Sequence, residues 1–281
     1  MGNNARRKVE SHSKSQQNQS SKPALFPWKL WLYTNFDCNL SCTYCVAESS
    51  PAAPRRSLGL PNVQRLVDEA VSLGFKEIFF TGGEPFILND IYEMLAYSSA
   101  RVRTTVLTNA MLLHGRRLAR LRTIANDNLI IQVSLDGGRA EEHDAYRGQG
   151  TWAKTVAGIK LLQAAGFRIK LSTTETAANR DHLDEVRSFR RSLGIAAEDH
   201  FIRPLARRGF SQEGITIEKE ILLPELTVTS DGIFWHPLAS PSSKDLQVSR
   251  DIFPLAAAVT AIQSWLDSLN STSGDMLQCF T

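Results

Sequence analysis

Strand and helix patterns alternate along most of this chain, and this alternation limits the possible folds more than any other feature. Strand patterns occur at residues 29–34, 75–80, 102–107, 129–135, 167–174 and 200–203. Helical patterns occur at residues 61–73, 90–100, 113–124, 151–165 and 180–193. Strand–helix units in series form a parallel sheet with right-handed crossovers. We therefore predict an α/β barrel or partial barrel, with its chemistry at the carboxyl ends of the strands.

Length and composition agree with one large folded unit. The chain has 281 residues, 42% of them hydrophobic, which suffices for one large α/β core with a small appendage. No apolar run approaches the roughly 20 residues of a membrane span, and the N-terminus lacks the apolar core of a signal peptide. We therefore predict a cytoplasmic protein with no membrane partner, in a compartment where thiols stay reduced.

The first 22 residues differ from the rest of the chain. They are rich in Ser, Gln, Asn and Lys, and Val9 is their only sizeable aliphatic side chain after Met1. Such a segment cannot offset its own ordering entropy, so we predict a disordered tail that is either solvated or bound to an electrostatic partner. The tail carries four net positive charges and the whole chain +3. The folded part is therefore about neutral, and we predict no nucleic acid as a partner.

Three cysteines, Cys38, Cys42 and Cys45, follow the first strand in the run C-N-L-S-C-T-Y-C. Three thiolates on one short loop can hold three irons of a [4Fe–4S] cluster and leave the fourth iron open. A structural zinc site would need a fourth Cys or His at a regular offset, but the next candidates are His114 and Cys279. A disulfide would leave one thiol over. The triplet therefore favours an iron–sulfur cluster.

A Gly-Gly-Glu-Pro turn follows the second strand directly. Gly82 and Gly83 let the backbone approach a ligand closely, Pro85 fixes the turn, and Glu84 places an acceptor at the strand end. Alone, this tetrapeptide is also typical of an ordinary turn. Combined with the cysteine spacing C-x3-C-x2-C, it resembles the motifs of the radical S-adenosylmethionine (SAM) enzymes.

This resemblance implies a fold, two cofactors and their chemistry. The fold is a partial (β/α)6 TIM-like barrel of the α/β class. In that family, the open iron chelates the amino and carboxylate groups of SAM, and an electron from the cluster splits the sulfonium to give a 5′-deoxyadenosyl radical. Cys38, Cys42 and Cys45 would ligate the cluster, Tyr44 would shield it from solvent, and the Gly-Gly-Glu-Pro motif with Glu84 would receive the amino group of SAM.

Three further strand ends or loops match the family. Ser134 and Asp136 lie in S-L-D-G after the fourth strand and correspond to residues that contact SAM. Arg147, in the stretch H-D-A-Y-R-G that begins at His143, can pair with the carboxylate of SAM in a geometry that lysine would not reproduce. Asn109 occupies the Thr-Asn-Gly position of the family, with Ala in place of Gly, on the adenine or substrate side. Without the resemblance, these three segments would be interpreted as ordinary strand ends and a surface loop.

Basic residues follow the sixth strand in the segment Arg-Pro-Leu-Ala-Arg-Arg-Gly at 203–209. Related enzymes place backbone contacts to adenine at this position. The arginines would either meet an anionic substrate or form a solvated loop, and the sequence leaves both interpretations open.

The last part of the chain predicts a small extension to the barrel. Residues 226–237 form a β-hairpin pattern around an Asp-Gly turn, and residues 254–269 a helix. The hairpin resembles the one that opens a SPASM or twitch extension, but Leu238 stands where a cysteine normally follows. We therefore predict three segments, a tail at 1–22, a barrel at 23–210 and a degenerate extension at 211–281 without auxiliary clusters. His236 is either a replacement ligand or a hydrogen-bonded surface residue.

The leading hypothesis is a radical SAM enzyme that abstracts hydrogen from a peptide or small metabolite. Its electron donor would be a flavodoxin or ferredoxin. The alternative is a non-catalytic iron–sulfur or zinc protein that binds a partner. Cys279 is a candidate hydrogen donor of the kind that some radical SAM epimerases use, or else a free thiol near the chain end.

Overall fold

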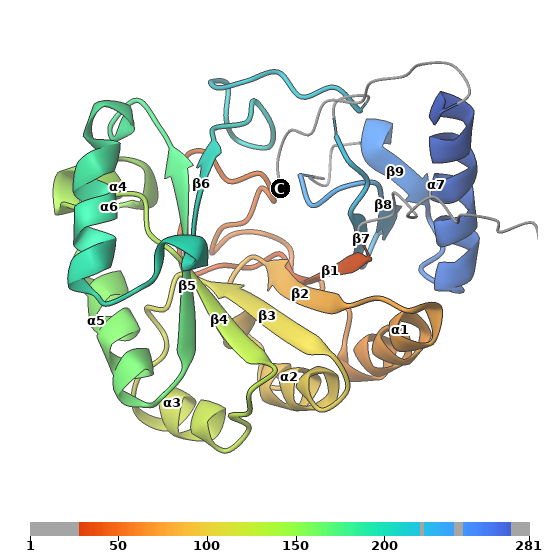
Figure 1. Cartoon of the computed structure of the whole chain (residues 1–281), viewed down its shortest axis with the longest axis horizontal. Coiled ribbons are helices and arrows are strands. Elements are labelled where there is room, and N and C mark those ends of the chain that lie inside the picture. The colour runs from red at the N-terminus through yellow and green to blue at the C-terminus, as the bar shows by residue number, and fades with distance from the viewer. Residues whose placement is uncertain (1–27, 220–221, 239–243, 271–281) are drawn as a thin grey trace, which may run out of the picture.

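In the part of the chain that the structure describes, nine strands form one open, curved sheet, with helices α1 to α6 along its outer side (Figure 1). The computed structural model describes residues 28–219, 222–238 and 244–270. Its strands are β1 (Lys29–Asn35), β2 (Glu77–Gly82), β3 (Arg103–Thr108), β4 (Leu129–Ser134), β5 (Arg168–Glu175), β6 (His200–Pro204), β7 (Leu226–Thr229), β8 (Gly232–Phe234) and β9 (Gln247–Ser249). Its α-helices are α1 (Leu60–Leu73), α2 (Ile91–Ser99), α3 (Gly115–Arg122), α4 (Ala140–Arg147), α5 (Thr151–Ala164), α6 (Leu183–Ser192) and α7 (Leu255–Asn270).

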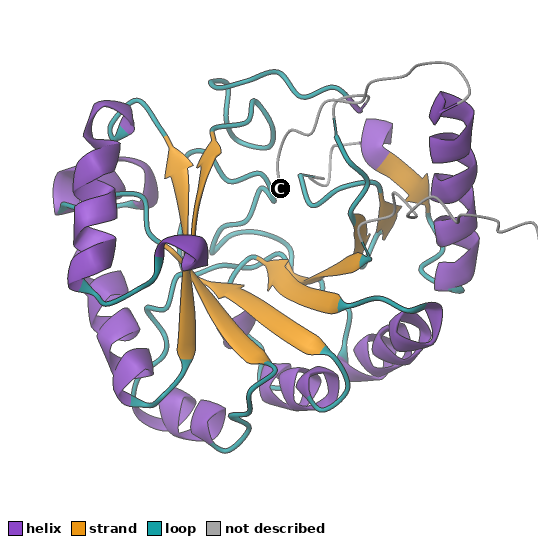
Figure 2. Cartoon of the chain, in the orientation of Figure 1, coloured by secondary structure: helices purple, strands orange, loops and turns teal. Residues whose placement is uncertain are grey.

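The strand order confirms the predicted partial barrel. The order across the sheet is β6-β5-β4-β3-β2-β1-β7-β8-β9, and β1 to β6 are parallel neighbours in chain order. Strands β6 and β9 form the two open edges, so the barrel does not close (Figure 2). Because parallel strands share one direction, the loops after β1 to β6 gather at the same end of the sheet. The cysteines and the other predicted site residues follow these strands.

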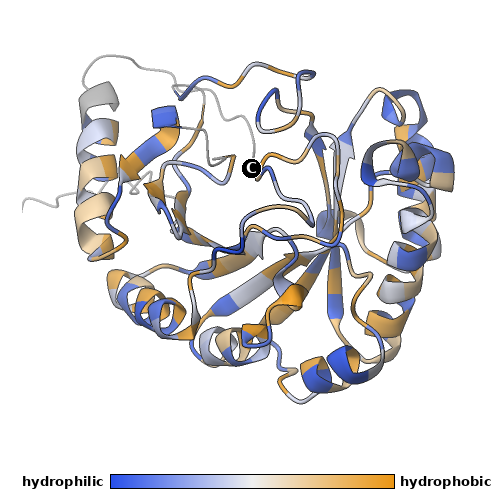
Figure 3. Cartoon of the chain, turned by 180° about the vertical axis from the view of Figure 1, so that it is seen from behind, coloured by the Kyte–Doolittle hydropathy of each residue, from blue (hydrophilic) through white to orange (hydrophobic). Residues whose placement is uncertain are grey.

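The two faces of the sheet have different compositions. In β1, Leu30 and Leu32 are fully buried in the core, whereas Trp31 and Tyr33 line cavities inside the barrel. This is the period of two expected for a strand. The ribbon coloured by hydropathy shows hydrophilic segments along the strands as well as on the helices (Figure 3). The inner face of the sheet is therefore partly polar, and the outer face carries the apolar core.

Helix ends follow the sequence signals in most units. Helix α1 ends at Gly74, which adopts φ 90° and donates its N–H to Val71 O at 3.1 Å, as expected for a glycine helix cap. Helix α4 is not predicted by the sequence pattern. It has only eight residues, of which Glu142 and His143 are buried, so no apolar stripe marks it.

The predicted C-terminal hairpin and helix are present, and they continue the sheet of the barrel. Strand β7 pairs in parallel with β1, and β8 returns antiparallel to β7. Helix α7 lies against α1, where Leu255 donates its backbone N–H to Glu69 at 2.7 Å. Strand β9, which pairs with β8, is not predicted by the sequence pattern. The hairpin therefore lies directly beside the first barrel strand and can contribute residues to the barrel interior.

Candidate active site

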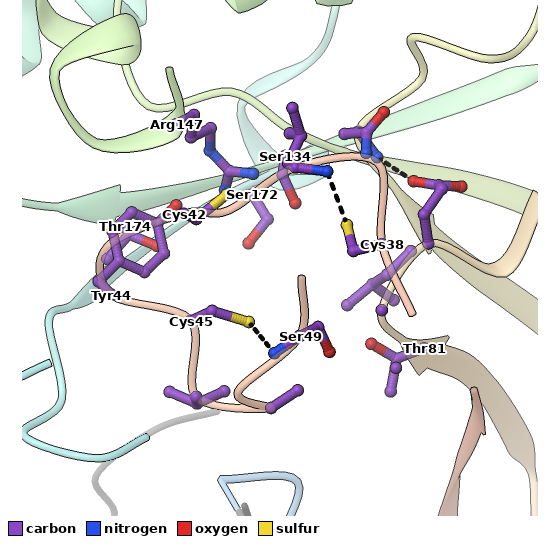
Figure 4. Close-up of a pocket in the computed structure, with 18 of the residues that line it drawn as sticks. Cys38, Cys42, Tyr44, Cys45, Ser49, Thr81, Ser134, Arg147, Ser172 and Thr174 are labelled. Carbon is purple, nitrogen blue, oxygen red and sulfur yellow. Dashed lines mark hydrogen bonds between the residues drawn. The ribbon is translucent and has the colours of Figure 1, made fainter. Parts of the chain in front are cut away.

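The three cysteines line one cavity at the carboxyl ends of the strands. We call it the cysteine cavity. Figure 4 shows the sulfur atoms of Cys38, Cys42 and Cys45 around a common space. Leu40 donates its backbone N–H to Cys38 Sγ at 3.4 Å, and Ser49 donates to Cys45 Sγ at 3.4 Å. Hydrogen bonds to sulfur are among the features with which proteins tune iron–sulfur clusters.

The donor set fits a cluster better than a single metal ion. Burial raises the pKa of Cys38 to about 12 and that of Cys42 to about 11, so both thiols stay protonated until a bound metal displaces their protons. Within the part of the chain that the structure describes, no three His, Cys, Asp or Glu side chains are grouped closely enough to hold one metal ion. A four-iron cluster bonds each thiolate to a different iron and so needs them further apart.

A fully buried hydroxyl beside the cysteine cavity lacks a hydrogen-bond partner among the described residues. The hydroxyl of Ser49 is buried and makes no hydrogen bond among the described residues. Buried polar atoms are normally hydrogen-bonded, so an orphaned hydroxyl beside Cys45 is consistent with a group that binds in this space. The sequence pattern does not single out Ser49, because a serine in a loop carries no periodic signal.

Gly82 and Gly83 hold the cysteine loop against β2. A Cβ at Gly82 would clash with the backbone oxygen of Asn35, and one at Gly83 with that of Asp37. The N–H of Gly83 donates to Asn35 O at 2.9 Å, and that of Glu84 donates to Asp37 O at 3.0 Å. The glycines thus allow a close approach of two backbone segments, in addition to lining the cavity as the sequence predicts.

Glu84 is buried and lines the cysteine cavity. Its carboxylate accepts hydrogen bonds from the Phe86 N–H at 3.1 Å, the Thr108 hydroxyl at 2.8 Å and the Asn109 N–H at 2.9 Å. Burial nevertheless raises the pKa of Glu84 to about 7, although these hydrogen bonds oppose the rise. A cation in the cavity would therefore stabilise the charged form of this carboxylate.

Asn109 and Ala110 form the turn after β3. Asn109 is buried, lines the cavity and donates its side-chain amide to Asn39 Oδ1 at 2.9 Å. Ala110 adopts φ 61°, a left-handed conformation that only glycine visits without cost. This geometry explains why the family pattern has glycine at this position.

Asp136 connects two cavity residues to the scaffold. It accepts hydrogen bonds from the Tyr44 hydroxyl and, at 2.6 Å, from Arg147 Nε. The Thr174 N–H donates to its other oxygen at 2.8 Å. Burial alone would raise the pKa of Asp136, but the charge of Arg147 and its hydrogen bond hold that pKa below its usual value. Asp136 is thus ionised behind Arg147, and among the described residues it is not part of the cavity wall.

His143 belongs to the same scaffold. Its Nδ1 accepts the Asp136 N–H at 3.1 Å, and its side chain is fully buried. Burial lowers the pKa of His143 to about 4, so the imidazole is neutral at physiological pH. This histidine supports the loop of Asp136 and does not line the cavity, as far as the described residues go.

Hydroxyl side chains complete the cavity wall. Ser134 lines it as predicted, and Ser172 and Thr174 of β5 line it as well. Ser134 and Ser172 are register partners on neighbouring strands. The β5 residues were missed in the sequence analysis, although the alternation in K-L-S-T-T-E at the end of a barrel strand is a signal that could have found them.

A family model described as the radical SAM superfamily matches residues 32–190, more than half of the chain. The chain belongs to the radical SAM superfamily. The prediction from the cysteine and Gly-Gly-Glu-Pro motifs is therefore confirmed. Radical SAM membership implies an iron–sulfur cluster and SAM as cofactors, and the three thiols in one cavity are the residues that fit the cluster.

Two curated relatives and one solved structure illustrate the likeness. The chain is 30% identical to the AdoMet-dependent heme synthase of Methanosarcina barkeri, over 73% of this chain and 58% of that protein. It is 31% identical to the mycofactocin maturase MftC of Mycolicibacterium smegmatis, over 66% of this chain and 46% of that protein. The chain thus spans about half the length of the curated relatives it matches.

Among solved structures, Streptococcus suis SuiB bound to the precursor peptide SuiA matches with a TM-score of 0.58 and 15% identity. The match covers 89% of this chain and 48% of that one. At this identity, the likeness shows that the two proteins share a fold, the partial barrel.

Several residues with a predicted role differ from the prediction in their surroundings, or lie outside the described residues. His236 is buried, and burial lowers its pKa to about 3, so it is a neutral interior residue. Arg208 pairs with Asp245 at 2.6 Å, whereas Arg203 lines cavities inside the barrel. Cys279 and the tail at residues 1–22 lie outside the described residues. No helix in the described ranges is long and apolar enough to cross a membrane.

Proposed function

We propose that this chain is a radical SAM enzyme that carries one [4Fe–4S] cluster on Cys38, Cys42 and Cys45. The observation that carries the proposal is the meeting of these three thiols in one cavity of a chain that belongs to the superfamily. When bound, the cluster and SAM would supply a 5′-deoxyadenosyl radical that abstracts hydrogen from the substrate. A flavodoxin or ferredoxin would supply the electron.

Glu84 and Arg147 would hold the two charged ends of the methionine part of SAM. The buried Glu84 carboxylate is suited to an ammonium group because a cation would offset its desolvation. Arg147 uses Nε to bind Asp136, and its two terminal nitrogens make no hydrogen bond within the described residues. These nitrogens would be free to bind a carboxylate as a fork. Asp136 would act as a positioning residue that orients Arg147.

The remaining cavity residues would position the rest of SAM. Ser134 and Asn109 line the cysteine cavity and offer a hydroxyl and an amide to the ribose and adenine. Tyr44 is buried beside Arg147, whose guanidinium lies 5.4 Å from its ring centroid. It would cover the cluster on that side. The cofactor supplies the chemistry, and these residues supply orientation and exclusion of water.

For the substrate we favour a peptide over a small metabolite. The supporting observation is that the solved structure SuiB, which matches over 89% of this chain, is bound to a precursor peptide. We further propose that the C-terminal β-hairpin and helix are a degenerate SPASM or twitch extension, since Cys279 is the only cysteine of this chain after Cys45. In that case the chain holds no auxiliary cluster.

Anaerobic reconstitution with iron and sulfide, followed by SAM and a reductant, tests the proposal. We expect about four irons per chain and formation of 5′-deoxyadenosine. Alanine at Cys38, Cys42 or Cys45 should abolish both, and Cys279→Ala should leave the iron content unchanged. About eight irons would contradict a single cluster. Iron binding without any 5′-deoxyadenosine would favour the alternative of a non-catalytic iron–sulfur protein.

Arg147→Ala tests the SAM site separately. Loss of one partner from a desolvated charged contact typically costs about 2–5 kcal/mol, so SAM binding should weaken strongly while the cluster spectrum persists. Arg187→Ala is the control, because Arg187 pairs with Asp184 on the surface of α6. Unchanged SAM affinity in Arg147→Ala would remove this residue from the cofactor site.

A further inference from the structure

A second cavity of about 240 Å³ lies inside the barrel. We call it the barrel cavity. It shares wall residues with the cysteine cavity, namely Tyr33, Val46, Thr81, Leu107, Arg203 and Leu238. Its other wall residues come from all the barrel strands except β3, and from the segments around Glu225 and His236. The two cavities therefore adjoin, and a molecule in the barrel cavity would lie next to the proposed SAM site.

A polar row on β5 connects the two cavities. Lys170 lines the barrel cavity, and Ser172 and Thr174 line the cysteine cavity. The three residues alternate along one strand and share one face. On the neighbouring strand β4, Gln132 is the register partner of Lys170 and also lines the barrel cavity. Lysine and glutamine side chains thus lie side by side in the barrel interior.

The cationic groups of this region form no close ion pair, although the charge of Glu225 acts on Arg203. Lys170 and Arg203 are half-buried, and neither forms an ion pair or hydrogen bond among the described residues. Both lie near the ring of Phe201, whose centroid is 5.6 Å from Lys170 Nζ and 6.0 Å from Arg203 Cζ. Both distances are near the limit of a cation–π contact. Two cations on adjacent strands thus face the cavity with their hydrogen-bonding capacity unused.

A buried amide beside them is also unsatisfied. Gln132 is 1% exposed, and its Nε2 has no hydrogen-bond partner in the described part of the chain. An unpaired buried amide costs free energy, so its presence in a cavity wall indicates that a ligand supplies the missing acceptor. The three groups, Lys170, Arg203 and Gln132, all need the same kind of partner, an oxygen that accepts hydrogen bonds.

The other charges of the barrel cavity do not meet this need. Glu225 forms its close ion pair with Lys29, at 3.2 Å, and acts on Arg203 only through its charge. Glu77 accepts the hydroxyl of Thr105 at 2.8 Å and is the register partner of Lys29, at the start of β2. His236 is neutral because burial and the positive charges of Arg203, Arg208 and Lys29 lower its pKa to about 3. The cavity wall therefore holds one positive charge in excess, on the side of β5 and β6.

We propose that the barrel cavity binds a carboxylate of the substrate between Lys170, Arg203 and Gln132. This assignment rests on the proposed radical SAM function and adds to it the chemical class of the group that enters the barrel. Two cations and an amide donor are complementary to a carboxylate, which accepts several charge-assisted hydrogen bonds. In a peptide substrate, the carboxylate is either an acidic side chain or the chain end.

Three small probes distinguish these sources in the reconstituted protein with SAM bound. They are N-acetylglutamate α-amide for an acidic side chain, N-acetylalanine for a chain end, and N-acetylglutamine amide as the neutral isostere. By anaerobic titration calorimetry, at least one acidic probe should bind about tenfold or more tightly than the neutral isostere, as charge-assisted hydrogen bonds would give. The acidic probe that binds more tightly identifies the source.

Variants test the residues. Lys170→Met and Arg203→Gln should each remove most of the preference for the acidic probe, with iron content unchanged in both. SAM affinity should stay unchanged in Lys170→Met, because Lys170 lines the barrel cavity and not the cysteine cavity. Lys160→Met on the exposed face of α5 is the control and should keep the preference. Lys170→Glu should shift the preference toward the cationic probe N-acetyllysine amide, which keeps the proposal testable if a neutral variant folds poorly.

Three results would overturn the assignment. They are equal binding of acidic and neutral probes, an acidic preference that survives both variants, and an Arg203→Gln effect on SAM affinity alone. Failure of the proposed function is distinct, because it appears as missing iron or missing 5′-deoxyadenosine in the wild-type protein. A wild-type protein that cleaves SAM but does not discriminate between the probes rejects the carboxylate site only.

Discussion

The cysteine cavity and the barrel cavity adjoin, but they differ in how their charged side chains are paired. In the cysteine cavity, Asp136 binds Arg147 and Tyr44, and Glu84 accepts three hydrogen bonds from its own scaffold. In the barrel cavity, Lys170 and Arg203 form no hydrogen bond or close ion pair among the described residues, although the charge of Glu225 acts on Arg203. The same sheet carries both, so the difference comes from local residues and not from the fold.

This difference separates two tasks. A paired network fixes side chains in place before a ligand arrives, which suits a cofactor that must be held in one geometry. Unpaired buried groups weaken the folded state and leave hydrogen-bonding capacity for a ligand. The network behind the cysteine cavity is therefore fixed by the protein itself, whereas the barrel cavity keeps the hydrogen-bonding capacity that the proposed carboxylate site requires.

Asp136→Ala should break the paired network with the largest effect. It leaves the buried Arg147 guanidinium without its partner, and removal of one partner from a buried ion pair typically costs about 3–5 kcal/mol. The free energy of unfolding, measured in urea on the metal-free protein, should fall by that amount. Asp231→Ala is the matched control, because Asp231 pairs with Arg56 at the surface and should cost less than about 1 kcal/mol.

The same experiment on the barrel cavity should give no comparable loss of stability. Lys170→Met removes a half-buried charge that has no acidic partner in the described residues, so the free energy of unfolding should stay within about 1 kcal/mol of the wild type or rise. A large loss of stability in Lys170→Met, or none in Asp136→Ala, would contradict the contrast between the two cavities.

Gly83→Ala tests how closely the cysteine loop must pack on β2. The new Cβ would clash with the backbone oxygen of Asp37, and such overpacking typically costs about 1–3 kcal/mol. We expect lower stability and less bound iron after reconstitution, because the loop that carries Cys38 must move. Gly166→Ala is the control. Gly166 has φ 84° with open space around it, so this variant should lose some stability and keep its iron.

The pH dependence of stability should reflect one buried histidine near each cavity. Burial lowers the pKa of His143 to about 4 and that of His236 to about 3, against about 6.5 in an unfolded chain. As the pH falls below about 6.5, the unfolded state takes up protons first and each histidine lowers the stability, by about 2 kcal/mol at pH 5. Glu84, whose pKa is raised to about 7 by burial, contributes with the opposite sign over this range. The histidine loss is therefore measured as the difference between wild type and variant in urea unfolding at pH 7.5 and pH 5.

His143→Gln and His236→Gln should each reduce the loss of stability between pH 7.5 and pH 5. His114→Gln, at an exposed position, should leave that loss unchanged. If His143→Gln and His236→Gln both keep the full pH dependence, these imidazoles are not held neutral in the folded protein.

Ala110→Gly should give the smallest effect, and a favourable one. The left-handed φ of 61° costs an alanine about 1–2 kcal/mol, while glycine loses more backbone entropy on folding. We expect a net gain of about 0.5–1 kcal/mol in the free energy of unfolding. Ala165→Gly, at φ −84° after α5, should instead destabilise the protein. A loss in Ala110→Gly would mean that the turn after β3 is not strained.

The fold and the cysteine cavity were largely predictable from sequence because their signals are local and repeated. Strand and helix patterns alternate through β6, and the cysteine, Gly-Gly-Glu-Pro, Thr-Asn-Ala and Ser-Leu-Asp-Gly motifs each lie at or just after the end of a strand. The cysteine spacing and the Gly-Gly-Glu-Pro turn are short runs whose meaning does not depend on distant residues. Helix α4 and strand β9 escaped prediction because both are short and neither carries an apolar period.

The residue pairs formed around the two cavities were not predictable from sequence. Asp136 was expected to contact SAM, but its partners Tyr44 and Thr174 come from distant segments that only the fold brings together. Lys170 and Gln132 are single polar residues within strands, and nothing local shows that they are register partners facing a cavity. Long-range contacts of this kind depend on sheet curvature and register, which sequence patterns do not specify.

The most direct test of the account is the EPR spectrum of the reduced, reconstituted protein titrated with SAM. If Cys38, Cys42 and Cys45 hold one cluster with an open iron, SAM should shift the signal, and SAM labelled with ¹⁵N at its amino group should add a nitrogen hyperfine coupling. The Arg147→Ala protein should need more SAM for the same shift. A spectrum that saturating SAM leaves unchanged would contradict the central claim that the open iron of this cavity binds the cofactor.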